Sequence, residues 1–265
     1  MTVTAPPTEE LGHALFEHFQ AGTSGPPLTD TYPDMTVEDA YRVQEALVER
    51  HLASGRRIVG RKIGLTSKAL QKQVGIDQPD FGVLFDSHVF ENRARFSMTE
   101  RRMVFPRIEA ELGFILSRDL SGPGLTAATV LAATQAVFPS FEIVDSRVTD
   151  WKIRLADTIA DNSSSWGLVI GDRLVDPRGV DLSTVGMVLE RDGEVLLTGA
   201  GAAVYDHPAR AVAWLGNKLA EFGVPLRAGE YVLSGSFTSV VDITPGTYRA
   251  RFGDGLGSVE LTITP

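Results

Sequence analysis

The chain has 265 residues, of which 43% are hydrophobic and 22% charged, so it can bury a sizeable core and global disorder is disfavoured. Its net charge of −9 and the lack of a basic stripe argue against a nucleic-acid-binding surface. The absence of cysteine excludes disulfides, thiolate nucleophiles and cysteine-ligated metal centres.

Neither membrane nor export signals are found in the sequence. No apolar stretch approaches the roughly 20 residues that span a bilayer, and residues 1–10 lack the basic start and apolar run of a signal peptide. We therefore expect a soluble, cytoplasmic protein with no membrane partner.

The N-terminal part is predicted to be helical. Apolar residues recur at helical spacing between positions 11 and 19, and the stretch 22–33, rich in Gly, Pro and Asp, ends this first helix. Thr36 followed by Asp39 is an Asp variant of the capping box and predicts the start of a second helix, which Gly55 ends.

From residue 58 onward, short β-like runs are separated by turns that contain glycine. Asp192-Gly193 between two runs predicts a tight hairpin. Two helices interrupt the strands, one over residues 126–138 and one over residues 206–223, with Asp206 as its N-cap. The predicted strands are residues 58–65, 108–116, 141–144, 167–170, 185–190, 195–198, 231–236, 247–252 and 258–264.

The order of these elements indicates the fold class. There is no regular βαβ alternation and no internal repeat, so the pattern predicts an α+β protein. We expect a helical N-terminal region, residues 1–55, packed tightly against a larger, β-rich domain, residues 56–265.

A Glu-x-Glu pair lies in the second predicted strand. Side chains alternate along a strand, so Glu109 and Glu111 share one face while Ile108 and Ala110 share the other. Adjacent carboxylates repel each other unless a cation lies between them or one is protonated, and Mg²⁺ and Mn²⁺ prefer oxygen ligands. The pair is therefore either the polar face of an amphipathic strand, the more common case, or part of a metal site.

A third carboxylate, Glu142, stands between Phe141 and Ile143 in a very apolar run. A buried carboxylate is costly unless it is paired or bound to a metal. Its partner is either Arg147, in an ordinary salt bridge, or a cation shared with the Glu-x-Glu pair. The residues alone favour neither alternative.

Lys62 lies inside an apolar strand with a glycine two positions away on each side, where a ligand or another backbone can approach closely. It is either a snorkelling surface lysine or a buried amine with a perturbed pKa. The loop-like stretch 77–82 contains Asp80, which is either a catalytic carboxylate or simply an Asx-turn residue.

Two further polar segments are ambiguous. Residues 157–165 form either a plain loop or a ligand rim, and residues 234–236 offer N–H groups and a hydroxyl that suit a carboxylate substrate. The five histidines are scattered, and the sequence contains neither a nucleophile elbow nor a complete dinucleotide fingerprint. Serine-hydrolase and nicotinamide chemistry are therefore disfavoured.

Taken together, these segments resemble the 2-keto-4-pentenoate hydratases, which belong to the fumarylacetoacetate-hydrolase superfamily. The resemblance follows chain order and covers nearly the whole sequence, which is far more specific than any single motif. One departure is residues 205–208, where many relatives read Leu-Gly-His-Pro and this chain reads Tyr-Asp-His-Pro. The segments that carry the resemblance are residues 60–67, 75–82, 106–111, 142–147, 160–164, 211–215 and 233–237.

The resemblance implies a mixed β-roll core with a small helical N-terminal extension, assembled as a homo-oligomer. It also implies an Mg²⁺ or Mn²⁺ cofactor and a small 2-oxo or 2-hydroxydienoic acid as substrate. The residues that it implies are Glu109, Glu111 and Glu142 as metal ligands, Lys62 and Asp80 as catalytic groups, and Asn162 and Ser236 as substrate-binding groups.

The implied reaction adds water to 2-hydroxypenta-2,4-dienoate to give 4-hydroxy-2-oxopentanoate in the meta-cleavage catabolism of aromatic compounds. A metal chelated by the C1 carboxylate and the C2 oxygen would stabilise negative charge on that oxygen. The alternatives are a 2-oxo-3-hexenedioate (4-oxalocrotonate) decarboxylase, a 2-oxohept-4-ene-1,7-dioate hydratase, or a non-catalytic partner subunit. Association with a related pathway enzyme is also compatible with the family. Residues 71–82 look more like the hydratases.

Overall fold

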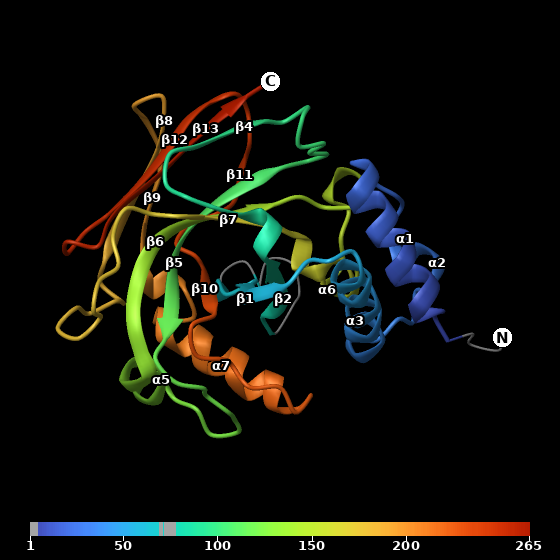
Figure 1. Cartoon of the computed structure of the whole chain (residues 1–265), viewed down its shortest axis with the longest axis horizontal. Helices are drawn as coiled ribbons and strands as arrows, with labels where there is room; N and C mark the ends of the chain where they lie inside the picture. The colour runs from blue at the N-terminus through green and yellow to red at the C-terminus, as the bar shows by residue number, and fades with distance from the viewer. Residues whose placement is uncertain (1–4, 69–70, 72–77) are drawn as a thin grey trace.

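The computed structural model describes residues 5–68, 71 and 78–265. Three helices lie together at the N-terminal side of the molecule (Figure 1): α1 (Thr8–Ala21), α2 (Leu28–Thr31) and α3 (Val37–Ala53). The capping box of α3 is confirmed, because Asp39 N donates to Thr36 Oγ1 at 3.1 Å and Thr36 N donates to Asp39 Oδ2 at 3.1 Å. Two predicted helices are thus present at their expected places.

The larger sheet of the described chain has eight strands and carries both parallel and antiparallel pairs. Its order is β2-β1-β10-β5-β6-β7-β3, and β11 pairs with β5. Strands β5 and β6 are the longest pair and run antiparallel along their whole length. The strands are β1 (Ile58–Gly64), β2 (Asp80–Phe85), β3 (Val89–Phe90), β5 (Arg107–Leu116), β6 (Thr134–Val144), β7 (Ser165–Ile170), β10 (Tyr231–Ser236) and β11 (Val241–Asp242).

The second sheet has the order β4-β13-β12-β8-β9. The predicted hairpin is confirmed, since Asp192 and Gly193 join β8 to β9 with φ angles of 52° and 85°. The main core includes Phe141 and Ile143 of the first sheet and Tyr248 of the second in one buried cluster. The strands of this sheet are β4 (Ala94–Ser97), β8 (Gly186–Arg191), β9 (Glu194–Ala200), β12 (Gly246–Phe252) and β13 (Gly257–Thr264).

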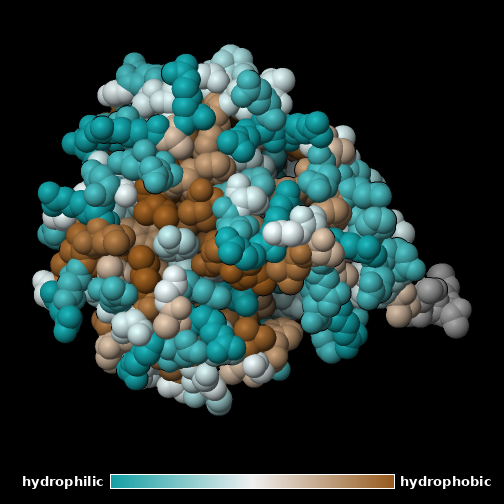
Figure 2. Space-filling model, in the orientation of Figure 1, coloured by the Kyte–Doolittle hydropathy of each residue, from teal (hydrophilic) through white to brown (hydrophobic). Residues whose placement is uncertain are grey.

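Helices complete the predicted α+β architecture. Helices α5 and α7 lie together below the larger sheet in Figure 1, and α6 lies between that sheet and α3. Apolar side chains on the visible surface gather over the sheets, whereas the N-terminal helices are mostly hydrophilic (Figure 2). No helix within the described residues is long and apolar enough to cross a membrane. The remaining elements are α5 (Ala127–Ala133), α6 (Leu155–Ala160), α7 (Pro208–Ala220) and the 3-10 turns η1 (Asp86–His88), η2 (Thr149–Trp151), η3 (Asn162–Ser164) and η4 (Gly201–Ala203).

Three local predictions were wrong. The helix expected over residues 126–138 ends at Ala133, and β6 then runs through Pro139 because it pairs with the full length of β5. His207 caps α7 in place of Asp206, since its ring Nδ1 accepts from the Ala209 N–H. The stretch expected to be a loop contains Asp80, which begins β2, while residue 77 lies outside the described residues.

The sequence pattern also missed strands β2, β3, β4 and β11. Every residue of β2 is buried, so the strand lacks the polar–apolar alternation that reveals a half-exposed strand. Strands β3 and β11 have only two residues each, too few for any periodicity. Of these four strands, β2 matters most for the site described below, because it begins with Asp80.

Candidate active site

The antiparallel pair β5–β6 brings three glutamates together. Glu109 lies directly opposite Glu142, and Glu111 lies opposite Ser140 on the same face of the sheet. One carboxylate oxygen of each glutamate lies within 4.8 Å of the others. The shared face predicted by strand alternation therefore also includes Glu142, and the apolar residues between the glutamates pack into the core.

These carboxylates have few partners of their own. Glu111 and Glu142 have no exposed surface, and the single described hydrogen bond to the pair is from Gly235 N to Glu111 Oε2 at 2.8 Å. Glu111 Oε1 and both oxygens of Glu142 are buried and accept no hydrogen bond from the described residues. Buried oxygens of this kind suit a hard divalent cation, which prefers carboxylate ligands.

The pKa values reflect this crowding. Burial raises the pKa of Glu142 to about 8, against the attraction of Lys62. Burial, followed by repulsion from Glu142 and Glu109, raises the pKa of Glu111 well above its usual range. Burial also raises the pKa of Glu109. Without a further cation, these shifts favour the protonated form of carboxyl groups whose ordinary pKa is 4.5.

Lys62 supplies one cation beside this cluster. Its side chain is 3% exposed, and its Nζ lies 3.3 Å from Glu142 Oε2 and 3.2 Å from Ser163 Oγ. Burial alone would lower the Lys62 pKa, but the surrounding carboxylates, Glu142 foremost, outweigh it and raise the pKa. The alternative of a snorkelling surface lysine is thereby excluded.

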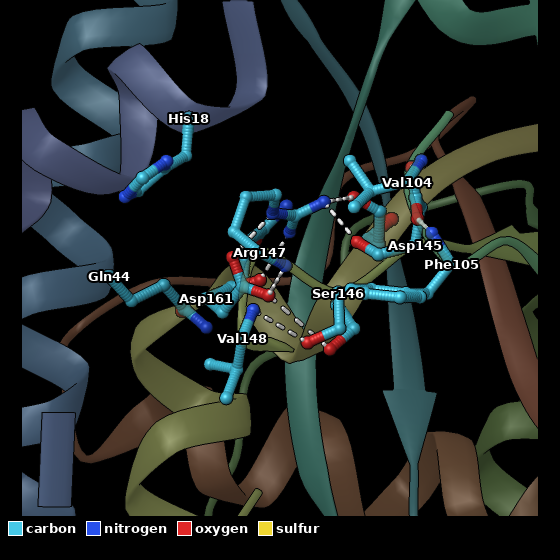
Figure 3. A network of polar contacts seen from close by, with 12 residues as sticks. His18, Gln44, Val104, Phe105, Asp145, Ser146, Arg147, Val148 and Asp161 are labelled. Carbon is cyan, nitrogen blue, oxygen red and sulfur yellow. Dashed lines mark hydrogen bonds and ion pairs between the residues drawn. The ribbon is translucent and has the colours of Figure 1, made fainter. Parts of the chain in front are cut away.

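The proposed salt bridge between Arg147 and Glu142 is also excluded. Arg147 is buried and pairs with Asp161, to which both its Nε and its backbone N–H donate. Figure 3 shows the Arg147 guanidinium directed at Asp161 and at the main chain of Asp145. Among the described residues, the cationic partner of Glu142 is Lys62.

Asp80 lies at the first position of β2, paired with Gly64 of β1. It is 1% exposed, and its carboxylate accepts from Ser163 Oγ at 2.8 Å and from Thr158 Oγ1 at 3.3 Å. Burial raises its pKa. A Cβ on Gly64 would lie 2.2 Å from Asp80 Oδ1, so only glycine allows this approach.

The two predicted substrate-binding residues lie in different surroundings. The Asn162 amide accepts from Val83 N at 2.8 Å and donates to Val83 O at 3.0 Å, so its side chain is committed to the main chain of β2. Ser236 ends β10 opposite Glu111 and is only partly buried. Ser236 thus borders the glutamate cluster, whereas a substrate contact by Asn162 would have to replace the bonds to Val83.

Sequence reasoning missed Ser163 and Thr158 as partners of Asp80. Both lie in the polar stretch 157–165, which is almost entirely buried, although its composition is that of an exposed loop. A dense polar stretch that the fold buries needs internal hydrogen-bond partners. Asp145 holds the residues that precede β5 in the same way, accepting from Val104 N at 2.9 Å and Phe105 N at 2.6 Å (Figure 3).

Comparison with known proteins gives one family and a group of close relatives. The family model of the fumarylacetoacetate (FAA) hydrolase C-terminal region matches residues 58–264. The chain is 44% identical to a 2-hydroxyhexa-2,4-dienoate hydratase of Comamonas testosteroni over 97% of each protein. It is 46% identical to a 2-keto-4-pentenoate hydratase of Paraburkholderia xenovorans, covering 95% of this chain and 93% of that one.

A solved structure is similar over the whole chain. The 4-oxalocrotonate decarboxylase from Pseudomonas putida, complexed with magnesium and adipate, has a TM-score of 0.94 and 36% identity, covering 99% of both chains. The same enzyme has also been solved with calcium and acetate. This similarity extends to the N-terminal helices that precede the segment matched by the family model.

Proposed function

Because this chain belongs to the fumarylacetoacetate hydrolase family, we propose that it is a metal-dependent hydratase of the meta-cleavage catabolism of aromatic compounds. Its reaction adds water to 2-hydroxypenta-2,4-dienoate and gives 4-hydroxy-2-oxopentanoate. The observation that carries the proposal is the convergence of Glu109, Glu111 and Glu142 beside Lys62. The hydratase names of relatives at 44–49% identity favour water addition over other reactions of the family.

The three glutamates would hold Mg²⁺ or Mn²⁺. Glu111 Oε1 and Glu142 Oε1 are buried without a hydrogen bond from the described residues and are available for the ion. Three carboxylates against one lysine also leave a local excess of negative charge. A bound divalent ion supplies Lewis acidity at the C2 oxygen of a 2-oxo or 2-hydroxydienoic acid. The magnesium found in a related structure supports this choice of ion.

Lys62 and Asp80 would move the protons in this reaction. The reaction requires a proton at C5 of the dienoate and removal of one from the water that adds at C4. Asp80 has a pKa raised by burial, which suits a carboxyl that holds and then delivers a proton. Lys62, kept cationic by its neighbours, balances negative charge on the substrate.

The neighbours of the glutamate cluster suit a substrate with an uncharged tail. Leu168 lies opposite Glu142 in the register of β6 and β7, and Leu233 lies beside Lys62. Both belong to a buried apolar cluster on this side of the sheet, together with Leu84 and Phe138. A distal carboxylate placed against such side chains would need a cationic partner, so the surroundings favour a dienoate over a diacid.

The 4-oxalocrotonate decarboxylase reaction is the second candidate, supported by similarity to that enzyme along the entire fold. Parallel assays on 2-hydroxypenta-2,4-dienoate and 2-oxo-3-hexenedioate, with Mg²⁺, Mn²⁺ or EDTA, separate the two. Metal-dependent loss of dienoate absorbance, with 4-hydroxy-2-oxopentanoate formed and no CO₂ released, supports the hydratase. Stoichiometric CO₂ from the diacid with no hydration of the dienoate would overturn it.

A further inference from the structure

Three consecutive residues beside the site have an unusual backbone conformation. Asn162, Ser163 and Ser164 have φ angles of 55°, 52° and 52°, none is glycine, and they are 2–3% exposed. A left-handed conformation costs an L-residue roughly 1–2 kcal/mol and is normally adopted by single residues. This left-handed turn, residues 162–164, therefore needs contacts that hold it.

Asn162 supplies two of these contacts. Its side-chain amide accepts from Val83 N at 2.8 Å and donates to Val83 O at 3.0 Å, the pair of bonds that a neighbouring strand would make. The Asn162 carbonyl lies against Gly82, where a Cβ would be only 2.3 Å from it. Asn162 thus fixes the turn to β2, the strand that begins with Asp80.

The ends of the turn are held by a second network. At the first end, Asp161 accepts from the Arg147 N–H at 2.9 Å, and its carbonyl accepts from Arg147 Nη2 at 2.7 Å. At the other end, Ser164 O accepts from Asp145 N at 2.9 Å. Figure 3 shows Asp145 and Asp161 beside the buried Arg147 side chain. The turn is thereby anchored to the chain that continues from β6.

The result of this anchoring is the position of one hydroxyl. Ser163 Oγ donates to Asp80 Oδ1 at 2.8 Å and accepts from Lys62 Nζ at 3.2 Å. We propose that Asn162 is a positioning residue, which holds the left-handed turn so that Ser163 links the Lys62 ammonium to the Asp80 carboxyl. The proposal rests on the proposed function, because it assigns Lys62 and Asp80 to proton transfer.

A double-mutant cycle tests the link. Asn162→Ala and Ser163→Ala should each lower kcat about tenfold or more with KM within about twofold, since both disturb a group that aligns the proton transfer. The double variant should be no slower than the slower single variant, because Asn162 acts through Ser163. If the two losses multiply, Asn162 acts independently of Ser163 and the proposal is wrong.

A matched control removes the same bonds elsewhere. Asn217 accepts from Leu125 N at 2.9 Å and donates to Leu125 O at 3.0 Å, far along the chain on α7. Asn217→Ala should lower the melting temperature and leave kcat unchanged. If it lowers kcat as much as Asn162→Ala does, the effect is one of general stability and the proposal is overturned.

A rescue variant tests the backbone conformation of the turn separately from its side-chain contacts. Ser164→Gly removes the conformational cost at one position of the turn and loses only a 3.5 Å contact to Asp161. Added to Asn162→Ala, it should recover part of the lost kcat. No recovery would contradict the claim that Asn162 acts by holding this conformation.

A second reaction separates this proposal from the proposed function. Mg²⁺-dependent exchange of the C3 hydrogens of 2-oxobutanoate with D₂O requires proton transfer but no water addition. If the wild-type protein exchanges these hydrogens but does not hydrate the dienoate, the proposed function fails. The double-mutant cycle is then measured with rates of hydrogen exchange. If the wild-type protein does neither, Lys62 and Asp80 are not an acid–base pair and the positioning role fails too.

Discussion

The strand pair β5–β6 and the segment 157–165 contribute to the same site by opposite means. The pair places Glu109 and Glu142 through regular antiparallel register, and any side chains at these positions would share the face. The segment places Ser163 through three residues with positive φ, a conformation held by particular side chains. In the proposed function, the half of the site assigned to the metal, the three glutamates, is therefore set by backbone periodicity. The half assigned to proton transfer, around Asp80, is set by a network of contacts.

The largest expected effect comes from a change in the strand pair β5–β6. Glu111→Gln keeps the shape of the side chain and should lower turnover at least about 1,000-fold, because one ligand of the Lewis acid is lost. Stability of the apoprotein should not fall, since burial and neighbouring carboxylates already disfavour the charge on Glu111. Steady-state assays and thermal melts in EDTA measure both quantities.

Glu190→Gln is the matched control for that variant. Glu190 lies on β8 of the other sheet and pairs with Arg251 at 2.6 Å, so its loss should leave turnover and Mg²⁺ binding unchanged. A large drop in the melting temperature of Glu111→Gln would show that the register of β5–β6 depends on its charges. The comparison between the two regions would then break down.

Lys62 connects the two regions, since its ammonium contacts Glu142 of the strand pair and Ser163 of the turn. Lys62→Met should lower turnover about 100- to 10,000-fold, the range expected for a group that assists proton transfer, while Mg²⁺ binding persists. Calorimetric titration with Mg²⁺ and turnover at saturating metal measure the two effects separately.

The adjacent residue gives the control for Lys62. Arg61 faces the other side of β1, where it lines a groove with Tyr41 and Phe222, so Arg61→Met should retain turnover. Equal losses in the two variants would mean that Lys62 acts through the stability of β1. Loss of Mg²⁺ binding in Lys62→Met would place the lysine in the metal half of the site.

A smaller effect, in melting temperature, should follow pH. The Glu142 pKa is raised from 4.5 to about 8 by burial, so between these values the folded apoprotein keeps a proton that the unfolded chain releases. Apoprotein stability therefore falls as pH rises from about 4.5 to about 8. A divalent ion replaces that proton, so the rise in melting temperature caused by saturating Mg²⁺ should be larger at pH 8.5 than at pH 6.5. A larger rise at pH 6.5 would contradict the assigned shift.

The same contrast explains what could be predicted from the sequence. Alternation around Glu109 and Glu111 and the apolar neighbours of Glu142 are local signals, which left a salt bridge and a shared cation equally open. The pairing of β5 with β6 brings the three residues together. The turn at residues 162–164 has only a weak signal, because Asn162 is of a type that often adopts positive φ but Ser163 and Ser164 are not. Strand β2 was missed because burial on both faces removes alternation. The turn and β2 together form the surroundings of Asp80, so these surroundings could not be predicted.

The smallest expected effect concerns the two hydrogen bonds that Asp80 accepts. It tests whether the shorter bond contributes more to catalysis. Thr158 Oγ1 lies 3.3 Å from Asp80 Oδ2, beyond the usual range for a hydroxyl donor, whereas Ser163 Oγ lies 2.8 Å from Asp80 Oδ1. Thr158→Val, which keeps the size of the side chain, should therefore lower kcat by less than about threefold, and Thr158→Ser should match the wild type. If Thr158→Val costs more than Ser163→Ala, α6 positions Asp80 and the turn is the lesser part of the network.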